Sequence, residues 1–233
     1  MSENAERRVS PEIIKPTKEV LMVFGQGPVQ EYEDKQNEQA RTGLNFFSRL
    51  NALAAAELLI EGETDEVIVS GGATGAKKEA TEGELMSQAI KKRLQSDIKR
   101  QLEQTSDPST TIHIGSRTYE IRLQDRSPED IEEDISTFLN SVVRIENQAQ
   151  DSLENFVNIL NMLDADTTSD THLSFLGIGF HANNKHSGAE MGRLQKLAEI
   201  FQLEGAIISA EDVLRDIAKK RRENSFVKSQ LQI

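Results

Sequence analysis

The chain has 233 residues with 39 acidic and 27 basic side chains, and its formal net charge is −12. A field of that sign repels nucleic-acid phosphates and anionic lipid surfaces, so we expect no nucleic acid and no membrane as partner. The chain contains no cysteine, which excludes disulfides, thiolate catalysis and cysteine-bound metal.

Residues 1–18 are predicted to form an N-terminal arm, because they contain two prolines and alternating charge. They include no apolar core of signal-peptide length, and no segment of the chain approaches the roughly 20 apolar residues of a membrane span. The default expectation is therefore a cytoplasmic protein. Residues 19–233 have the length of a single α/β domain.

Four short apolar runs, each ending in a small or polar cluster, are the clearest structural signal in the sequence. They are rich in Val, Ile, Leu and Phe, as buried strands are, and three of them lead into helical patterns. The runs cover residues 20–24, 66–69, 142–145 and 173–178. This alternation predicts an α/β fold with a Rossmann-like parallel sheet flanked by helices on both faces.

The segments between the first two strands differ in character. Residues 29–42 are highly polar and predict a loop or a poorly anchored helix, which would be either a lid or a plain surface insertion. Residues 44–60 predict a strong helix, because Phe47, Leu50 and Leu53 recur at spacings of three and Gly62 follows its end.

A second helix is predicted over residues 78–102, with a run of cations towards its end that suits the helix dipole. Residues 105–140 break the alternation and predict an insertion, a small β-hairpin around Gly115-Ser116 followed by a helix that Ser127-Pro128 starts. The alternation then resumes with further elements at residues 151–163, 173–178, 188–201 and 206–208, before a last helix from Ser209 or Ala210.

The carboxyl ends of parallel strands line the ligand crevice of such a fold, so the residues after the strands are the candidate site. Glycines there let the backbone approach a ligand and present N–H groups to an anion, or they form a tight strand-to-helix turn. An ordinary NAD site is not predicted, because the third glycine of its fingerprint is missing and Pro28 removes one donor. The candidate ligand-binding residues in these turns are Gly25, Gln26, Gly27, Ser70, Gly71 and Gly72.

Three carboxylates are candidate catalytic or binding groups. Glu82 and Glu146 fall near strand ends, and Glu154 falls one turn into a helix, where Asn155 adds an amide. Grouped carboxylates can share a proton, hold a divalent metal or accept hydrogen bonds from a sugar or amine. For Glu154, capping of its own helix explains the residue equally well.

His181 is the sharpest single candidate for acid, base or phosphate-donor chemistry, because it follows the apolar run at 173–178 and has a reference pKa near 6.5. A core histidine bonded to the backbone is the alternative. Arg49, near the start of the helix at 44–60, is a candidate for binding a carboxylate or phosphate, or for a surface ion pair.

Several of these segments, in this order, resemble the SanA and YdcF-like family. The resemblance spans about residues 20–205, apart from the insertion, and rests on residues 49–56, 70–72, 81–86, 151–155 and 179–181. It implies a Rossmann-like fold and small-molecule binding or envelope metabolism, and at least one member is associated with S-adenosylmethionine.

Carried over by position, the resemblance implies site roles for a set of residues spread along the chain. They are Gly71, Gly72, Thr81, Glu82, Met86, Glu146, Ser152, Glu154, Asn155 and His181. Three features depart from the family. Ala149 replaces a usual serine, the arginine expected soon after the histidine comes only at Arg193, and there is no membrane anchor.

Three functions follow as hypotheses. The favoured one is a small-molecule-binding, transferase-like protein for an adenosine-containing or phosphorylated ligand such as S-adenosylmethionine. The second is a phosphoester hydrolase linked to envelope precursors, with His181 and the carboxylates in acid, base or metal roles. The third is a regulatory interaction module with a degenerate pocket, whose partner binds residues 105–140. The residues fix neither a reaction, a metal requirement nor an oligomeric state.

Overall fold

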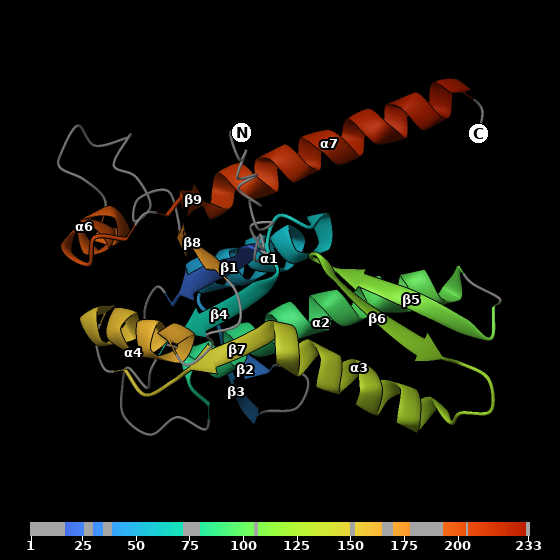
Figure 1. Cartoon of the computed structure of the whole chain (residues 1–233), viewed down its shortest axis with the longest axis horizontal. Coiled ribbons are helices and arrows are strands. Elements are labelled where there is room, and N and C mark those ends of the chain that lie inside the picture. Colours follow the sequence, from blue (N-terminus) through green and yellow to red (C-terminus); the bar gives the residue numbers. More distant parts are fainter. Residues whose placement is uncertain are drawn as a thin grey trace, which may run out of the picture.

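A computed structural model describes residues 17–25, 30–34, 39–71, 80–104, 107–149, 152–164, 170–177, 193–203 and 205–231. Five strands form one sheet in the order β7-β4-β1-β8-β9, and every neighbouring pair is parallel (Figure 1). They are β1 (Thr17–Phe24), β4 (Glu66–Ser70), β7 (Val143–Glu146), β8 (Asp170–Gly177) and β9 (Ile207–Ser209). The predicted Rossmann-like α/β class is confirmed. Strands β4 and β7 lie on one side of β1, and strands β8 and β9, which come later in the chain, lie on its other side.

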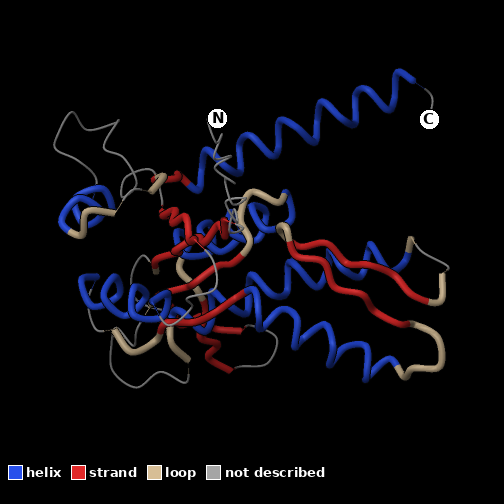
Figure 2. The backbone as a smooth tube through the Cα atoms, viewed as in Figure 1, coloured by secondary structure: helices blue, strands red, loops and turns tan. Residues whose placement is uncertain are grey.

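Helices cover both faces of this sheet (Figure 2). One face packs against α1 (Phe46–Glu61), α2 (Glu82–Glu103), α3 (Pro128–Val142) and α7 (Ala210–Leu231). The other packs against α4 (Ser152–Asp164) and α6 (Arg193–Ile200). The alternation of side chains along β1 explains its central place: Leu21 and Val23 enter the first core, whereas Met22 and Phe24 enter the second.

The starts of α1 and α2 are fixed by capping side chains. Asn45 precedes α1 and accepts a hydrogen bond from the Ser48 N–H at 2.9 Å. Thr81 and Glu84 form a reciprocal capping box at the start of α2. Helix α2 follows β4, and Asn45 and Ser48 at the start of α1 bond to Glu82 at the start of α2. Both starts therefore lie where the strands of the sheet end, which we call the carboxyl edge.

The predicted insertion is also present. Its hairpin consists of β5 (Ser109–Ile114) and β6 (Arg117–Arg122), and α3 follows. The turn docks at the opposite, amino edge of the sheet, where the Gly115 N–H donates to the Leu59 carbonyl at 2.7 Å. Gly115 has a φ of +62°, and a β-carbon there would lie 2.4 Å from the Thr64 carbonyl oxygen, so the turn requires glycine.

Two boundary predictions are wrong. We predicted a loop or a poorly anchored helix over residues 29–42, but the described residues of this range form strands, because β2 (Gln30–Asp34) and β3 (Gln39–Gly43) pair antiparallel. A two-stranded ladder satisfies its main-chain groups without an apolar run, so polar composition did not reveal it. The predicted arm is also too long by two residues, because β1 begins at Thr17 and the Lys18 ammonium pairs with Glu66 at 2.8 Å.

Candidate functional site

The carboxyl edge brings together residues that follow three adjacent strands. The Gly25 N–H, after β1, donates to the Ser70 carbonyl of β4 at 2.8 Å. The Gly71 N–H, after β4, donates to the Glu146 carbonyl of β7 at 3.3 Å. These bonds continue the sheet by one residue and place the turn residues side by side, as the strand order predicts.

The same bonds distinguish between two expectations about the glycines. We left two alternatives open for these glycines, N–H groups that face an anion or a tight strand-to-helix turn, and the N–H groups of Gly25 and Gly71 are bonded to carbonyl groups, as in the second alternative. The glycines also allow α2 to approach. A β-carbon on Gly25 would lie 2.1 Å from the Glu82 Oε2, and one on Gly71 would lie 3.0 Å from the Gly83 nitrogen.

Glu82, the first residue of α2, places its carboxylate beside Gly25 at the end of β1. Its side chain is buried, at 3% relative exposure. The Oε1 atom accepts hydrogen bonds from the Ser48 hydroxyl and, at 3.3 Å, from the Asn45 amide. Glu82 therefore joins the N-termini of α1 and α2, where both helix dipoles stabilise a negative charge.

Glu146, a candidate catalytic or binding carboxylate, accepts hydrogen bonds from four donors in the structure. Its buried carboxylate accepts the Ser70 hydroxyl at 2.8 Å on Oε2. On Oε1 it accepts the N–H groups of Gln148 and Ala149 at 2.8 and 3.0 Å, and the Asn158 amide at 3.0 Å. Four donors saturate the carboxylate, so Glu146 is a structural anchor that holds the β7–α4 connection against β4.

Two amide oxygens at this edge have no hydrogen-bond donor among the residues that the structure describes. The Asn51 amide donates to the Phe24 carbonyl at 3.0 Å, while its Oδ1 is buried and unpartnered. The Asn155 Oδ1 is buried and unpartnered as well, and Asn155 lies one turn before Asn158 on the same side of α4. Since α1 and α4 cover opposite faces of the sheet, the two oxygens flank the carboxyl edge.

No family model, curated protein or solved structure matches this chain. The resemblance to the SanA and YdcF-like family therefore stays a prediction, and we interpret the site from its own chemistry.

Of the remaining predicted residues, the structure describes Glu154 and Arg49, and both are exposed. Glu154 is exposed in the first turn of α4. Arg49 is exposed on α1, and its guanidinium donates to the Leu44 carbonyl at 3.3 Å. His181, Gln26, Gly27 and Gly72 lie outside the described residues.

Within the described ranges, no three histidine or carboxylate side chains lie together in a way that would hold a metal ion. None of the helices in those ranges combines the length and the apolar character needed to cross a membrane.

Three polar residues of α1 and its cap were missed from the sequence. Asn45, Ser48 and Asn51 are spaced by three residues and are all buried. Polar residues at that spacing lie on one side of a helix, and here that side faces the sheet. A polar stripe within an alanine-rich, otherwise buried helix face is the signal that identifies them. Together with Glu82 they make the carboxyl edge rich in hydrogen-bond acceptors.

Proposed function

We propose that this protein binds a small adenosine-containing molecule of the S-adenosylmethionine type at the carboxyl edge of its sheet. The unpartnered, buried amide oxygen of Asn51 carries the proposal, with that of Asn155 on the other face of the sheet. A buried acceptor without a donor costs free energy, and a ligand N–H or O–H group would supply the missing bond. An adenine amino group, ribose hydroxyls and an α-ammonium group are donors of this kind.

The charges and donors of the site support the same ligand class. Glu82 holds a buried carboxylate against the end of β1, which favours a cationic ligand. The N–H groups of Gly25 and Gly71 are bonded within the sheet, so they do not provide the donors that a phosphate needs. S-adenosylmethionine carries positive sulfonium and ammonium groups. We therefore favour it over a phosphorylated ligand and over phosphoester hydrolysis.

In this proposal Asn51 and Asn155 accept hydrogen bonds from the ligand, and Glu82 supplies the opposite charge. Glu146 keeps the β7–α4 connection in place behind them. When bound, S-adenosylmethionine supplies an electrophilic methyl group, which is the chemistry that a transferase-like function uses.

The test is thermal unfolding of the full chain with S-adenosylmethionine, S-adenosylhomocysteine, ATP and simple phosphoesters. At a hundred times the dissociation constant a ligand stabilises by about 2.7 kcal/mol, which for a chain of this size raises Tm by about 5–10 °C. We expect that shift with S-adenosylmethionine. If no adenosine-containing compound shifts Tm, the proposal is wrong, and turnover of phosphoesters would then favour the hydrolase.

A substitution at Asn155 distinguishes an effect on ligand binding from an effect on folding. Asn155→Ala removes an unpartnered oxygen, so we expect the unliganded Tm to stay unchanged while affinity for S-adenosylmethionine falls about tenfold. Asn161→Ala, at an exposed position of the same helix, is the matched control and should leave affinity unchanged. Equal affinities of the two variants would show that α4 does not contribute to the site.

A further inference from the structure

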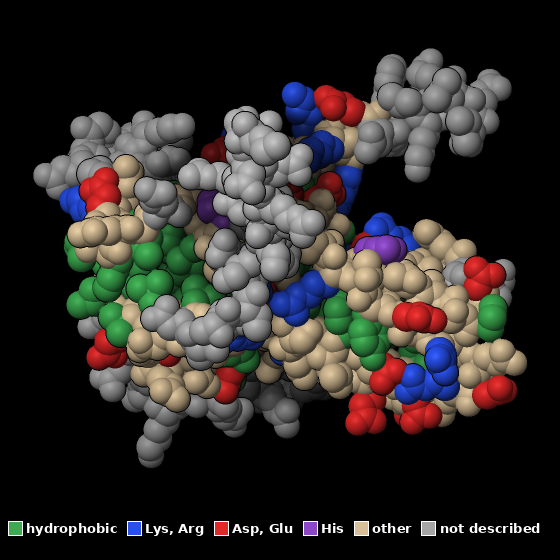
Figure 3. Space-filling model, viewed as in Figure 1, with side chains coloured by type: hydrophobic (Ala, Val, Ile, Leu, Met, Phe, Trp, Pro, Cys, Tyr) green, Lys and Arg blue, Asp and Glu red, His purple; other side chains and the backbone are tan. Residues whose placement is uncertain are grey.

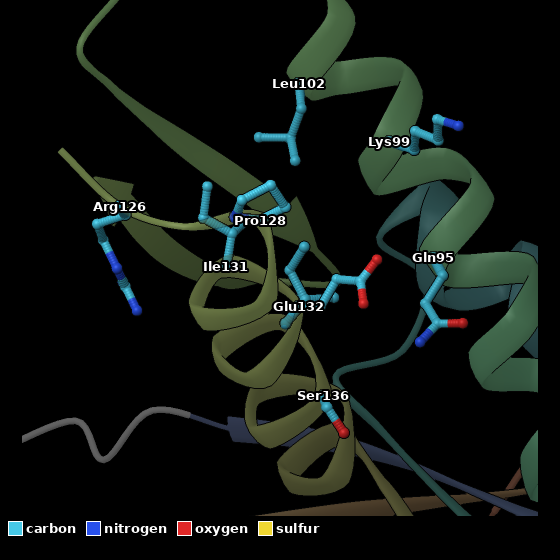
Figure 4. A pocket seen from close by; sticks show the side chains of 9 residues that line it. Gln95, Lys99, Leu102, Arg126, Pro128, Ile131, Glu132 and Ser136 are labelled. Atoms are coloured by element: carbon cyan, nitrogen blue, oxygen red, sulfur yellow. The ribbon is translucent and has the colours of Figure 1, made fainter. Parts of the chain in front are cut away.

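A pocket of about 700 Å³ lies between α2 and α3, in the half of α2 that is remote from the carboxyl edge. Figure 4 shows side chains of the two helices facing one another across it. Leu102 of α2 and Ile131 and Ile135 of α3 provide its apolar lining. Leu102 and Ile131 are only partly buried, so the groove leaves apolar surface uncovered.

Exposed lysines predominate on one side of the groove and exposed glutamates on the other. The α2 side has Lys92 and Lys99, seven residues apart and therefore on one face of the helix. The α3 side has Glu129, Glu132 and Glu133, and Figure 3 shows acidic side chains gathered over this helix. We call these the basic side and the acidic side of the groove.

These five charged groups are exposed, and none forms an ion pair with another residue of the described chain. Other cations near the groove are already paired: Arg126 with Asp134, and Arg100 with Asp97. A partner that fits must therefore present an acidic surface to α2 and a basic surface to α3.

We propose that the occupant of this groove is a second copy of the same chain. A two-fold axis across the groove sets the basic side of each copy against the acidic side of the other, since in such an interface residue i meets j and j meets i. The α3 helix of each copy then covers the apolar lining of its partner. The charge pattern of the groove is therefore complementary to itself. A binding site for an unrelated partner would not need this property. This assembly is independent of the ligand proposed above.

The experiment is sedimentation equilibrium of the full chain over a range of concentrations, with charge-reversal variants. We expect a reversible dimer with twice the 26.0 kDa mass of one chain. Lys99→Glu and Glu132→Lys each place like charges face to face, so each should weaken dimerisation by at least about tenfold. The double variant K99E/E132K exchanges the charges and should regain the affinity. Circular dichroism and Tm establish that every variant is folded.

Three outcomes would contradict the proposal. A single 26.0 kDa species at every concentration overturns the proposal, and leaves the groove to a different occupant. A dimer whose affinity is unchanged by both single variants places the interface elsewhere and overturns it too. A double variant that stays as weak as the single ones contradicts the pairing of the basic and acidic sides. The test for ligand binding measures a shift in Tm, whereas this test measures the mass of the assembly. Either proposal can therefore fail without the other.

Discussion

The carboxylate of Glu82 occupies the space that a side chain on Gly25 would need. A β-carbon added to Gly25 would lie 2.1 Å from Oε2 and 2.4 Å from Cδ of Glu82. The Glu82 side chain cannot simply swing aside, because it is buried and its Oε1 is held by Ser48 and Asn45. The absence of a side chain at position 25 thus fixes where the negative charge of the site lies.

Gly25→Ala should therefore displace Glu82 and destabilise the protein. Forcing extra atoms into a packed region costs about 1–3 kcal/mol, which for a chain of this size lowers Tm by about 2–12 °C. Thermal unfolding measures the loss. The double variant G25A/E82A has room for the new methyl group, so its loss should be smaller than the sum of the two single losses. Additive losses would show that the two residues do not interact.

Glu146→Gln should destabilise the fold, because the neutral amide lacks the negative charge that strengthens the hydrogen bonds from the four donors. Loss of charge-assisted hydrogen bonds to a buried group costs about 1.5–3 kcal/mol. Urea unfolding measures this cost. Glu154→Gln makes the same chemical change at an exposed position, and its effect should stay within about 0.5 kcal/mol. Equal effects of the two variants would contradict the role of Glu146 as an anchor.

The sheet could be predicted from sequence because its strands are buried on both faces and appear as continuous apolar runs. The run at 20–24 is one example, since Met22 and Val23 are both fully buried although they point to opposite faces. The hairpin of β2 and β3 could not be found in this way, because its stability rests on main-chain pairing between polar residues.

The packing of α1 shows a second limit of sequence patterns. Phe47 and Leu53 support the helix prediction by their spacing, yet their exposed fractions are 46% and 40%. The face that packs is built from small residues such as Ala52 and Ala55, which let the helix lie close to its neighbours. A ranking by hydrophobicity alone would therefore predict that Phe47 and Leu53 are more buried than Ala52 and Ala55, which is the reverse of what the structure shows.

The candidate site was predictable only at the level of position. Strand order correctly predicts that Gly25, Gly71 and Glu146 lie together, because parallel strands end at one edge. Strand order does not predict hydrogen-bond partners. Only the structure shows that the N–H groups of the glycines are bonded and that the carboxylate of Glu146 accepts four hydrogen bonds. The unpartnered oxygen of Asn51 depends on the packing of α1 against β1 and was likewise not visible in the sequence.

Glu66→Gln should cost about 3 kcal/mol of stability, because it leaves several cations without their buried counter-charge. The Glu66 carboxylate has 2% exposure and pairs with Lys18, Arg117 and Arg144 at 2.8, 3.2 and 2.9 Å. Chemical denaturation measures the loss. The exposed pair of Lys220 and Glu63, at 3.9 Å, provides the control, since Lys220→Ala should change stability by less than about 1 kcal/mol.

Asp65 should contribute to the stability of the protein above mildly acidic pH. Burial alone would raise the pKa of Asp65, but hydrogen bonds from Ser116 and the Glu19 N–H, with the charge of Arg117, outweigh it and lower the pKa below its ordinary value of 3.8. A carboxylate whose pKa is lower in the folded state stabilises the fold above pH 3.8. That contribution is lost as pH falls through the folded-state pKa.

Denaturant unfolding at a series of pH values tests this contribution. The wild-type chain should lose more stability than Asp65→Asn between neutral pH and pH values below 3.8. If the free energy of unfolding of the two proteins changes with pH to the same extent, the pKa of Asp65 is the same in the folded and unfolded chains and the prediction is wrong.

Helix α2 spans 22 residues, so it is about 33 Å long. Glu82 at its start and Lys99 in its fifth turn are separated by about 25 Å. Effects of substitutions this far apart, with no shared contacts, add without cross-terms. In the two proposals, α2 carries the ligand-binding carboxylate at one end and the dimer contact at the other. Each end can therefore be redesigned without changing the result at the other end.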